Sequence, residues 1–201
     1  MNVKVIEKDP MFYKIFRPII TFIFNIIYRP TYIGSENIPK TGKIIIAGNH
    51  TSPLDPFIIM GSTKRIVHGF AKIELFKKGI VGYVVRHLGS IPVDRKNHSL
   101  DPLGTAKTFL DKGMLVGIFP EGTINKTHET VTLPFKIGAV KLAHDTKTKI
   151  VPFVIKGEFK PFRKGLRICY FKPIECKDKD LDKDNDKLRK IIEENLINEE
   201  V

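Results

Sequence analysis

The pattern of hydrophobic and polar residues predicts an alternation of strands and helices along most of the chain. Short apolar runs rich in β-branched residues predict buried strands at residues 43–48, 65–70, 114–119, 150–155 and 166–171, with a short extended segment at 90–93. Between them, helical spacing of apolar residues predicts helices at residues 56–62, 82–88, 100–112 and 136–144. This alternation favours an α/β fold, a single-domain sandwich of a largely parallel central sheet flanked by helices.

The N-terminal segment differs from the rest because it is dense in Phe and Ile. Residues 11–28 read MFYKIFRPIITFIFNIIY, an apolar run interrupted by polar residues that include Lys14 and Arg17. The interruptions argue against a membrane-spanning helix, and no small-residue cleavage site follows that would mark a secretory signal. We expect a helix in the membrane interface, with Lys14 and Arg17 beside the headgroups and Phe12 and its apolar neighbours toward the acyl chains. The alternative is an ordinary core helix that caps the domain.

The C-terminal part combines a charged run with an amphipathic helix. Lys and Asp alternate at residues 177–187, which favours a solvated linker, and the apolar residues that follow the possible N-cap Asp186 have helical spacing. With 201 residues, 42% of them hydrophobic, the chain suits one globular domain. We therefore divide it into an N-terminal membrane-associating segment (1–30), an α/β domain (31–176) and a charged linker with a C-terminal helix (177–201).

Charge gives a first indication of the ligand. The formal net charge is +12, and because the last 25 residues carry six basic and nine acidic groups, the first 176 residues carry +15. A body this basic attracts polyanions such as nucleic acid, anionic lipid or an acidic substrate, although solubility alone would also explain it. The only cysteines, Cys169 and Cys176, indicate a reducing compartment, and the common dinucleotide, redox and P-loop motifs are absent from the sequence.

His50 and Asp55 form the most distinctive polar pair in the chain. They belong to the segment NHTSPLD at residues 49–55, directly after a predicted buried strand, where open α/β sheets bind their ligands. With Pro53 turning the chain, the Asp55 carboxylate can accept a hydrogen bond from one imidazole nitrogen and leave the other free as a general base. No GxSxG nucleophile elbow accompanies the pair, which favours a base that activates a substrate hydroxyl. A structural His–Asp cap is the alternative.

Two further segments contain residues suited to binding anions. Residues 119–123 (FPEGT) follow another predicted strand, so Glu121 could hold a substrate hydroxyl and Gly122 could let backbone amides approach an oxyanion. Residues 89–95 (GSIPVDR) end in Arg95, whose guanidinium suits bidentate phosphate binding. Taken singly, residues 119–123 could be a plain strand-to-loop turn, and an arginine such as Arg95 is more often a surface residue.

Together, the segments NHxxxxD, GxIPVDR, FPEGT and VP, in this order, resemble the glycerolipid acyltransferases, specifically the 1-acylglycerol-3-phosphate acyltransferases. The resemblance covers residues 32–154 and includes AKIEL at 71–75 and LPFKIGA at 133–139. Several ordered motifs at fitting separations are far more specific than any one of them.

The resemblance implies roles for particular residues. It makes His50 the general base and Asp55 its orienting partner. It places the acceptor and its phosphate against a second set of residues, namely Lys72, Arg95, Glu121, Gly122 and Thr123. Family members usually continue FPEGT with Arg-Ser, whereas this chain has Ile124 and Asn125, so one expected cation is missing and the identity of the acceptor stays open.

The implied reaction transfers an acyl chain from a thioester of acyl carrier protein or coenzyme A to the sn-2 hydroxyl of lysophosphatidic acid, giving phosphatidic acid. The basic body and the apolar N terminus fit this reaction, because both substrates are anionic and the acceptor resides in membranes. We expect an anionic membrane surface as a partner, on its cytoplasmic face, and no metal, no further cofactor and no nucleic acid. Two alternatives remain: the same chemistry on another lysophospholipid, and a noncatalytic basic module that binds membrane or nucleic acid.

Overall fold

The computed structural model describes residues 10–97, 99–126, 129–178 and 180–198. The first nine residues of the predicted N-terminal segment and the last three of the C-terminal segment lie outside these ranges. The described strands are β1 (Thr31–Ile33), β2 (Ile44–Gly48), β3 (Val67–Lys72), β4 (Ile91–Val93), β5 (Leu115–Ile118), β6 (Ile150–Lys156) and β7 (Arg167–Tyr170). The helices are α1 (Pro10–Tyr28), η1 (Ser35–Asn37, a 3₁₀ turn), α2 (Asp55–Ser62), α3 (Ile73–Phe76), α4 (Gly79–His87), α5 (Pro102–Asp111), α6 (Gly138–Thr146) and α7 (Leu181–Ile197).

The described strands form one sheet in the order β1-β7-β6-β2-β5-β3-β4. β2 lies at its centre and pairs in parallel with both β5 and β6, and β3 pairs in parallel with β5 and β4. Among the pairings between these described strands, β6–β7 alone is antiparallel, and β1 runs parallel to β7 at the edge. The predicted α/β fold with a largely parallel sheet is therefore confirmed.

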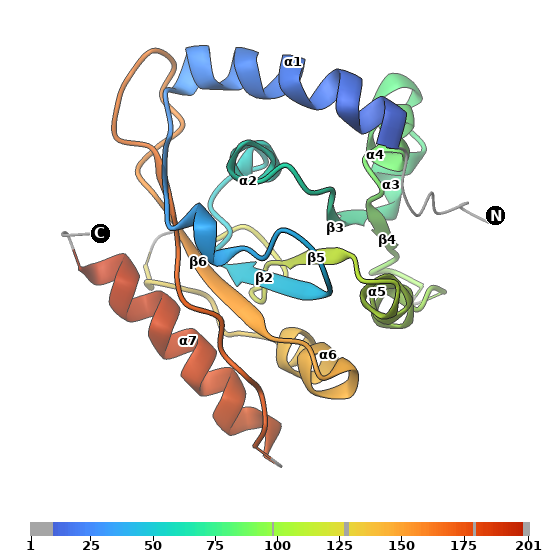
Figure 1. The fold of residues 1–201 in the computed structure, drawn as a ribbon, viewed down its shortest axis with the longest axis vertical. Coiled ribbons are helices and arrows are strands. Elements are labelled where there is room, and N and C mark those ends of the chain that lie inside the picture. Colours follow the sequence, from blue (N-terminus) through green and yellow to red (C-terminus); the bar gives the residue numbers. More distant parts are fainter. Residues whose placement is uncertain (1–9, 98, 127–128, 179, 199–201) are drawn as a thin grey trace.

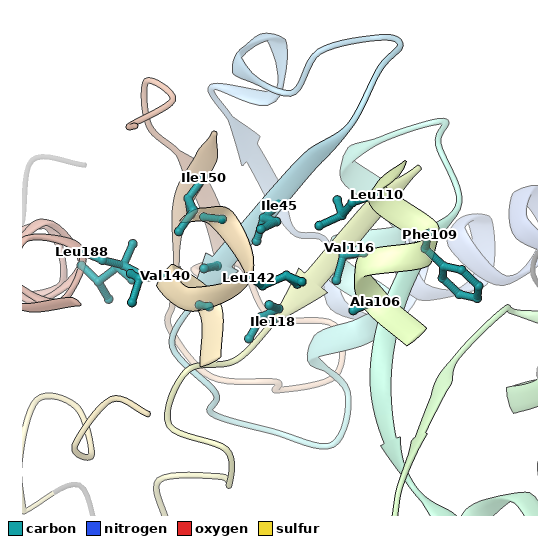
Figure 2. Packing of buried hydrophobic residues seen from close by; sticks show 14 of the residues in the cluster. Ile45, Ala106, Phe109, Leu110, Val116, Ile118, Val140, Leu142, Ile150 and Leu188 are labelled. Carbon is teal, nitrogen blue, oxygen red and sulfur yellow. The ribbon is translucent and has the colours of Figure 1, made fainter. Parts of the chain in front are cut away.

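Helices cover both faces of the sheet, with α1 and α2 on one side and α5, α6 and α7 on the other (Figure 1). Successive side chains of β2 point to opposite faces of the sheet, so this one strand contributes to both cores. Ile45 and Ala47 belong to the core beneath α5–α7, whereas Ile44 and Ile46 belong to the core beneath α1 and α2. Figure 2 shows the first of these cores, in which strand residues meet residues of α6 and α7, among them Ile45, Val116, Ile150, Val140, Leu142 and Leu188.

Helix α1 lies across α2, and its inner face is fixed to the body by polar contacts. The Tyr13 hydroxyl donates to the Arg65 carbonyl at 2.8 Å. Arg17 Nε donates to the carbonyls of Met60 and Thr63, at 3.1 and 3.0 Å, where α2 ends. The expected position of Arg17 beside headgroups is therefore wrong: the guanidinium satisfies carbonyls that the last turn of α2 leaves unpaired. Phe12, which was expected to face acyl chains, is also buried.

The opposite face of α1 is apolar and open. We define this outer face by its exposed large side chains, Met11, Ile15, Phe16, Ile19, Phe22, Ile23 and Ile26, which are between 43% and 73% exposed. By length and composition α1 could cross a membrane, with a mean hydropathy of 1.3 over 18 residues, of which 22% are buried. Helix α1 thus combines features of both sequence-based alternatives, because one face packs as a core helix and the other leaves its apolar residues uncovered.

Helix α7 begins earlier than the charge pattern indicated. Its N-cap is Asp180, whose carboxylate accepts from the Asp182 backbone N–H at 3.1 Å, so much of the run expected to be a solvated linker is helical. Leu188 and Ile192 of this helix are fully buried in the core that includes β6. The alternating Lys and Asp residues hid the helix because its first turns carry few apolar residues.

Candidate active site

Parallel pairing brings the predicted site residues to one edge of the sheet. His50 follows the end of β2 and Glu121 follows the end of β5, the neighbouring strand. Lys72 ends β3 and is paired in register with Val93 of β4, two residues before Arg95. The carboxyl ends of four adjacent strands thus supply the candidate site, as the position of each motif after a strand predicted.

The His50 side chain forms a directed contact with Asp55. His50 Nδ1 lies 2.7 Å from Asp55 Oδ2, and Asp55 is fully buried while 18% of the His50 side chain is exposed. Because a carboxylate accepts hydrogen bonds, the arrangement assigns the proton to Nδ1 and leaves the Nε2 lone pair unprotonated. This is the arrangement that a general base requires.

The Asp55 carboxylate is oriented by the turn that precedes it. Oδ2 accepts from the backbone N–H groups of Thr51 and Ser52 at 2.7 and 3.0 Å, and Oδ1 accepts from the Thr51 hydroxyl at 3.0 Å. Asp55 is also the first residue of α2, where a negative charge is favoured. These donors keep the carboxylate in position even when the imidazole changes its protonation.

The segment after β5 holds His50 from three sides. The imidazole stacks on the Phe119 ring, with centroids 4.0 Å apart and an interplanar angle of 9°. The His50 backbone N–H donates to Glu121 Oε1 at 2.8 Å, and the His50 carbonyl accepts from the Asn125 N–H at 3.0 Å. Residues 119–125 therefore set the position of the imidazole, a role that the sequence alone did not indicate for Phe119 or Asn125.

Glu121 is occupied by backbone donors in the structure. While Oε1 accepts from His50, Oε2 accepts from the Leu133 N–H at 2.8 Å, and the residue is only 3% exposed. Burial raises the pKa of Glu121, and the two backbone N–H groups partly oppose that rise. These contacts suit a residue that positions His50; the expected contact with a substrate hydroxyl stays a prediction.

Gly122 joins Arg95 to this segment. Its N–H donates to the Phe119 carbonyl at 2.9 Å, so that donor is engaged in a turn, and its φ of +68° explains why glycine occupies the position. The Arg95 guanidinium donates to the Gly122 carbonyl. Lys72 and Thr123 are both exposed. The structure thus brings Arg95 to the predicted acceptor segment, whereas the phosphate role of Lys72 and the acceptor role of Thr123 stay predictions.

Asp94 orders the turn that carries Arg95, and sequence analysis did not single it out. Its carboxylate accepts from the backbone N–H groups of Lys96 and Asn97 and from the Ser99 hydroxyl, at 3.1, 3.0 and 2.7 Å. The Asn97 N–H, followed by the Ser99 hydroxyl, lowers the pKa of Asp94 to about 2. The bond from the Lys96 N–H, two residues on, is that of an Asx-turn, a conformation that Asp favours.

Asn49 is a second residue whose role no local sequence pattern indicates. Its side chain donates to the Ile155 carbonyl at 2.9 Å and accepts from the Ile155 N–H at 2.8 Å, so it continues the β2–β6 pairing beyond Gly48. At Gly48 itself, an added Cβ would lie 2.4 Å from the Phe153 ring. Both residues fix the end of β2 immediately before His50.

Comparison with known proteins identifies the family. A sequence model of the Acyltransferase family matches residues 29–156, and the chain therefore belongs to the Acyltransferase family. The matched region runs from the end of α1 to the end of β6, and it contains all the residues of the site described above.

Two curated relatives carry the same name, 1-acyl-sn-glycerol-3-phosphate acyltransferase. The protein of Bacillus subtilis is 35% identical over 123 residues, covering 61% of this chain and 60% of the relative. That of Borreliella burgdorferi is 34% identical over 135 residues, covering 66% of this chain and 53% of the relative. The chain thus spans little more than half the length of these relatives.

A solved structure is similar in fold. The crystal structure of the 1-acyl-sn-glycerophosphate acyltransferase of Thermotoga maritima superposes with a TM-score of 0.76, covering 92% of this chain and 78% of that chain. The two sequences are 22% identical, so this likeness shows the fold alone.

We predict that Glu121→Gln displaces the base and destabilises the fold. A carboxylate offers an acceptor oxygen to each of the two backbone N–H groups, whereas an amide has one oxygen and turns an NH₂ group toward the other donor. An unsatisfied buried donor costs about 1–3 kcal/mol. Urea unfolding measures the loss, and the turnover number should fall with it. Unchanged unfolding and turnover would show that Glu121 does not hold His50.

The pKa of Asp94 leads to a pH-dependent prediction. Because the pKa of Asp94 in the folded protein, about 2, lies below its ordinary value, its contribution to stability is present above that ordinary value and is lost as pH falls toward 2. The difference in unfolding free energy between the wild type and Asp94→Asn should therefore be constant at neutral pH and shrink in acid. A difference that is independent of pH would contradict the assignment. Acid-dependent urea titrations of both proteins provide the measurement.

Proposed function

We propose that the protein transfers an acyl chain from a thioester to the sn-2 hydroxyl of 1-acyl-sn-glycerol 3-phosphate, producing phosphatidic acid. The observation that carries this proposal is the His50–Asp55 pair, in which Asp55 engages Nδ1 and leaves Nε2 available at the carboxyl edge of the sheet. The family assignment and the names of the relatives support it. The thioester is carried by coenzyme A or by acyl carrier protein.

The proposed mechanism is direct transfer with His50 as general base. Nε2 removes the proton of the acceptor hydroxyl as its oxygen attacks the thioester carbon, and Asp55 stabilises the resulting imidazolium through Nδ1–H. The tetrahedral intermediate then collapses, the C–S bond breaks, and the imidazolium returns its proton to the leaving thiolate. Oxygen replaces sulfur on the acyl carbon without an acyl-enzyme intermediate.

Stacking on Phe119 supports this role for His50. An imidazole stacked on the Phe119 ring cannot rotate freely about its Cβ–Cγ bond. Nε2 therefore keeps one direction while the proton moves. Holding a base in a fixed direction reduces the entropy lost on reaching the transition state. The contacts of Glu121 and Asn125 with the His50 backbone act in the same sense.

We assign the acceptor phosphate to Arg95 and Lys72. A guanidinium has five N–H donors, and the contact of Arg95 with Gly122 uses only one nitrogen, so donors remain for a phosphate. Lys72 stands at the end of the strand paired with β4, and its exposed side chain adds a second positive charge. With Ile124 in place of a cation, these two residues carry the recognition of the phosphate.

We further propose that α1 docks on an anionic membrane surface at its cytoplasmic face. The outer face of α1 offers a continuous apolar strip, and the inner face is fixed to the body by Tyr13 and Arg17. Such a helix lies in the interface plane with its apolar side chains below the headgroups. Docking gives the site access to an acceptor that is itself dissolved in the membrane.

We predict that His50→Ala lowers turnover by about 10²–10⁴-fold, the usual cost of removing a general base. Asp55→Asn should lose much of the activity through a misdirected ring. The assay follows labelled acyl groups from coenzyme A and acyl carrier protein to a panel of lysolipids, with circular dichroism to check folding. His144→Ala, which changes an exposed histidine on α6, is the matched control and should retain activity. Activity retained by His50→Ala would refute the mechanism.

The phosphate assignment predicts a change that depends on the charge of the acceptor. Arg95→Ala should raise the Michaelis constant for lysophosphatidic acid by about 10–100-fold, because a charge-assisted hydrogen bond is lost. Arg95→Lys should recover part of it, since an ammonium lacks the bidentate geometry. For an uncharged monoacylglycerol acceptor, Arg95→Ala should change the Michaelis constant much less. Equal losses on both acceptors would instead make Arg95 a structural support of Gly122.

A further inference from the structure

A second exposed apolar group lies next to α1, on helix α4. Ile80 is 84% exposed, which is the largest value among the large hydrophobic side chains of the described residues. Val81 and Tyr83 are 48% and 51% exposed. An isoleucine this open at the start of a helix contributes nothing to the core, and three such residues within four positions form a patch rather than a scattered surface.

Helix α4 adjoins the N-terminal end of α1 (Figure 1). The Phe12 ring lies 5.8 Å from the Tyr83 ring and 5.1 Å from the His87 ring. Residues 80, 83 and 87 share one face of a helix, because they are three, four and seven positions apart. Ile80 therefore extends, by one turn, the face of α4 that contacts α1. Phe12 in turn stacks on Phe16 of the outer face of α1, with ring centroids 4.4 Å apart.

The same end of α4 is positively charged. Lys77 and Lys78 are exposed and directly precede the helix, and their side chains form no hydrogen bond or ion pair within the described part of the chain. Between residues 67 and 93, Glu74 is the single acidic residue. Exposed apolar side chains beside unpaired lysines are the combination that an anionic lipid surface binds, since the apolar groups enter the acyl region and the ammonium groups meet phosphates.

We propose that the start of α4 is a second membrane-docking element, in which Ile80 and Val81 insert below the headgroups and Lys77 and Lys78 bind lipid phosphates. The inference rests on the proposed function, because it takes the acceptor to be a membrane lipid. It names an anionic bilayer as the occupant of this surface. A second copy of the chain is the competing occupant that the experiment excludes.

Docking at α4 connects the membrane to the acceptor site. Lys72 immediately precedes α3, and α3 leads within a few residues to Lys77 and Lys78. Lipid phosphates held by these lysines lie along the same short segment as the residue to which we assign the acceptor phosphate. With α1 alone the body could roll about the helix axis; contacts at α1 and α4 together fix its orientation.

The absence of tryptophan from the sequence permits a direct test. Three single-tryptophan forms of the full chain are made: Ile80→Trp on α4, Ile19→Trp on the outer face of α1, and Ile197→Trp at the exposed end of α7, where the isoleucine is 66% exposed. Each is mixed with vesicles of phosphatidylglycerol and phosphatidylcholine, with and without brominated acyl chains. We expect a blue-shifted, bromine-quenched emission for Ile80→Trp and Ile19→Trp, and neither change for Ile197→Trp.

Charge variants give an independent measurement. Lys77→Gln combined with Lys78→Gln should weaken partitioning into the anionic vesicles by about 30-fold, since each lysine near such a surface contributes about fivefold. Partitioning into pure phosphatidylcholine should not change. Lys183→Gln combined with Lys187→Gln, on exposed positions of α7, is the matched control and should bind as the wild type does.

The outcomes separate the two proposals. If the emission of Ile19→Trp shifts to the blue on vesicles and that of Ile80→Trp does not, the α4 inference is wrong while docking through α1 stands. If Ile80→Trp shifts without lipid as protein concentration rises, the patch binds a second copy and the lipid assignment is wrong. If no form binds vesicles, docking fails at both elements. Acyl transfer to monomeric short-chain lysophosphatidic acid tests the proposed chemistry separately, and its absence would refute that function alone.

Discussion

The parallel pairing of β2 with β5 is the constraint on which the candidate site depends. Ala47 is in register with Ile118, so the segments that leave the two strands emerge side by side at one edge of the sheet. This allows residues 119–125 to enclose His50 by stacking on its ring and bonding both its backbone groups. A shift of one residue in this pairing would turn every side chain of β2 to the opposite core and would remove the enclosure.

The site is built from buried polar groups that satisfy one another. Asp55, Glu121 and Asn49 are 0%, 3% and 5% exposed, and the structure gives each of them hydrogen-bond partners for its oxygen atoms. Burial without partners would cost several kcal/mol, roughly 2–7 for an uncompensated group. With partners present, the same low-dielectric surroundings make the network rigid. The imidazole of His50 is the member that stays partly open to solvent, which the proposed general base requires.

The sequence predicted much of the fold because its strands and helices have clear periodicities. The buried strands of the central sheet, the order of the helices and the placement of His50, Asp55 and Arg95 after strand ends all followed from local patterns and from the family resemblance. Contacts between distant segments were not predictable in this way. Glu121 meets His50 across 71 positions, and Arg17 reaches the end of α2 across 46, so no local pattern records either contact. The face of α1 that Arg17 occupies was misassigned for the same reason.

The position of β1 has a consequence for how the chain is made. Among the described residues β1 pairs only with β7, matching Thr31 to Arg167, so an early strand of the sheet waits for a late one. During synthesis from the N terminus, β1 stays without a partner until more than 130 further residues have been added. Strand β1 therefore joins the sheet late in folding. The apolar helix α1, directly before β1, leaves the ribosome long before that sheet is complete.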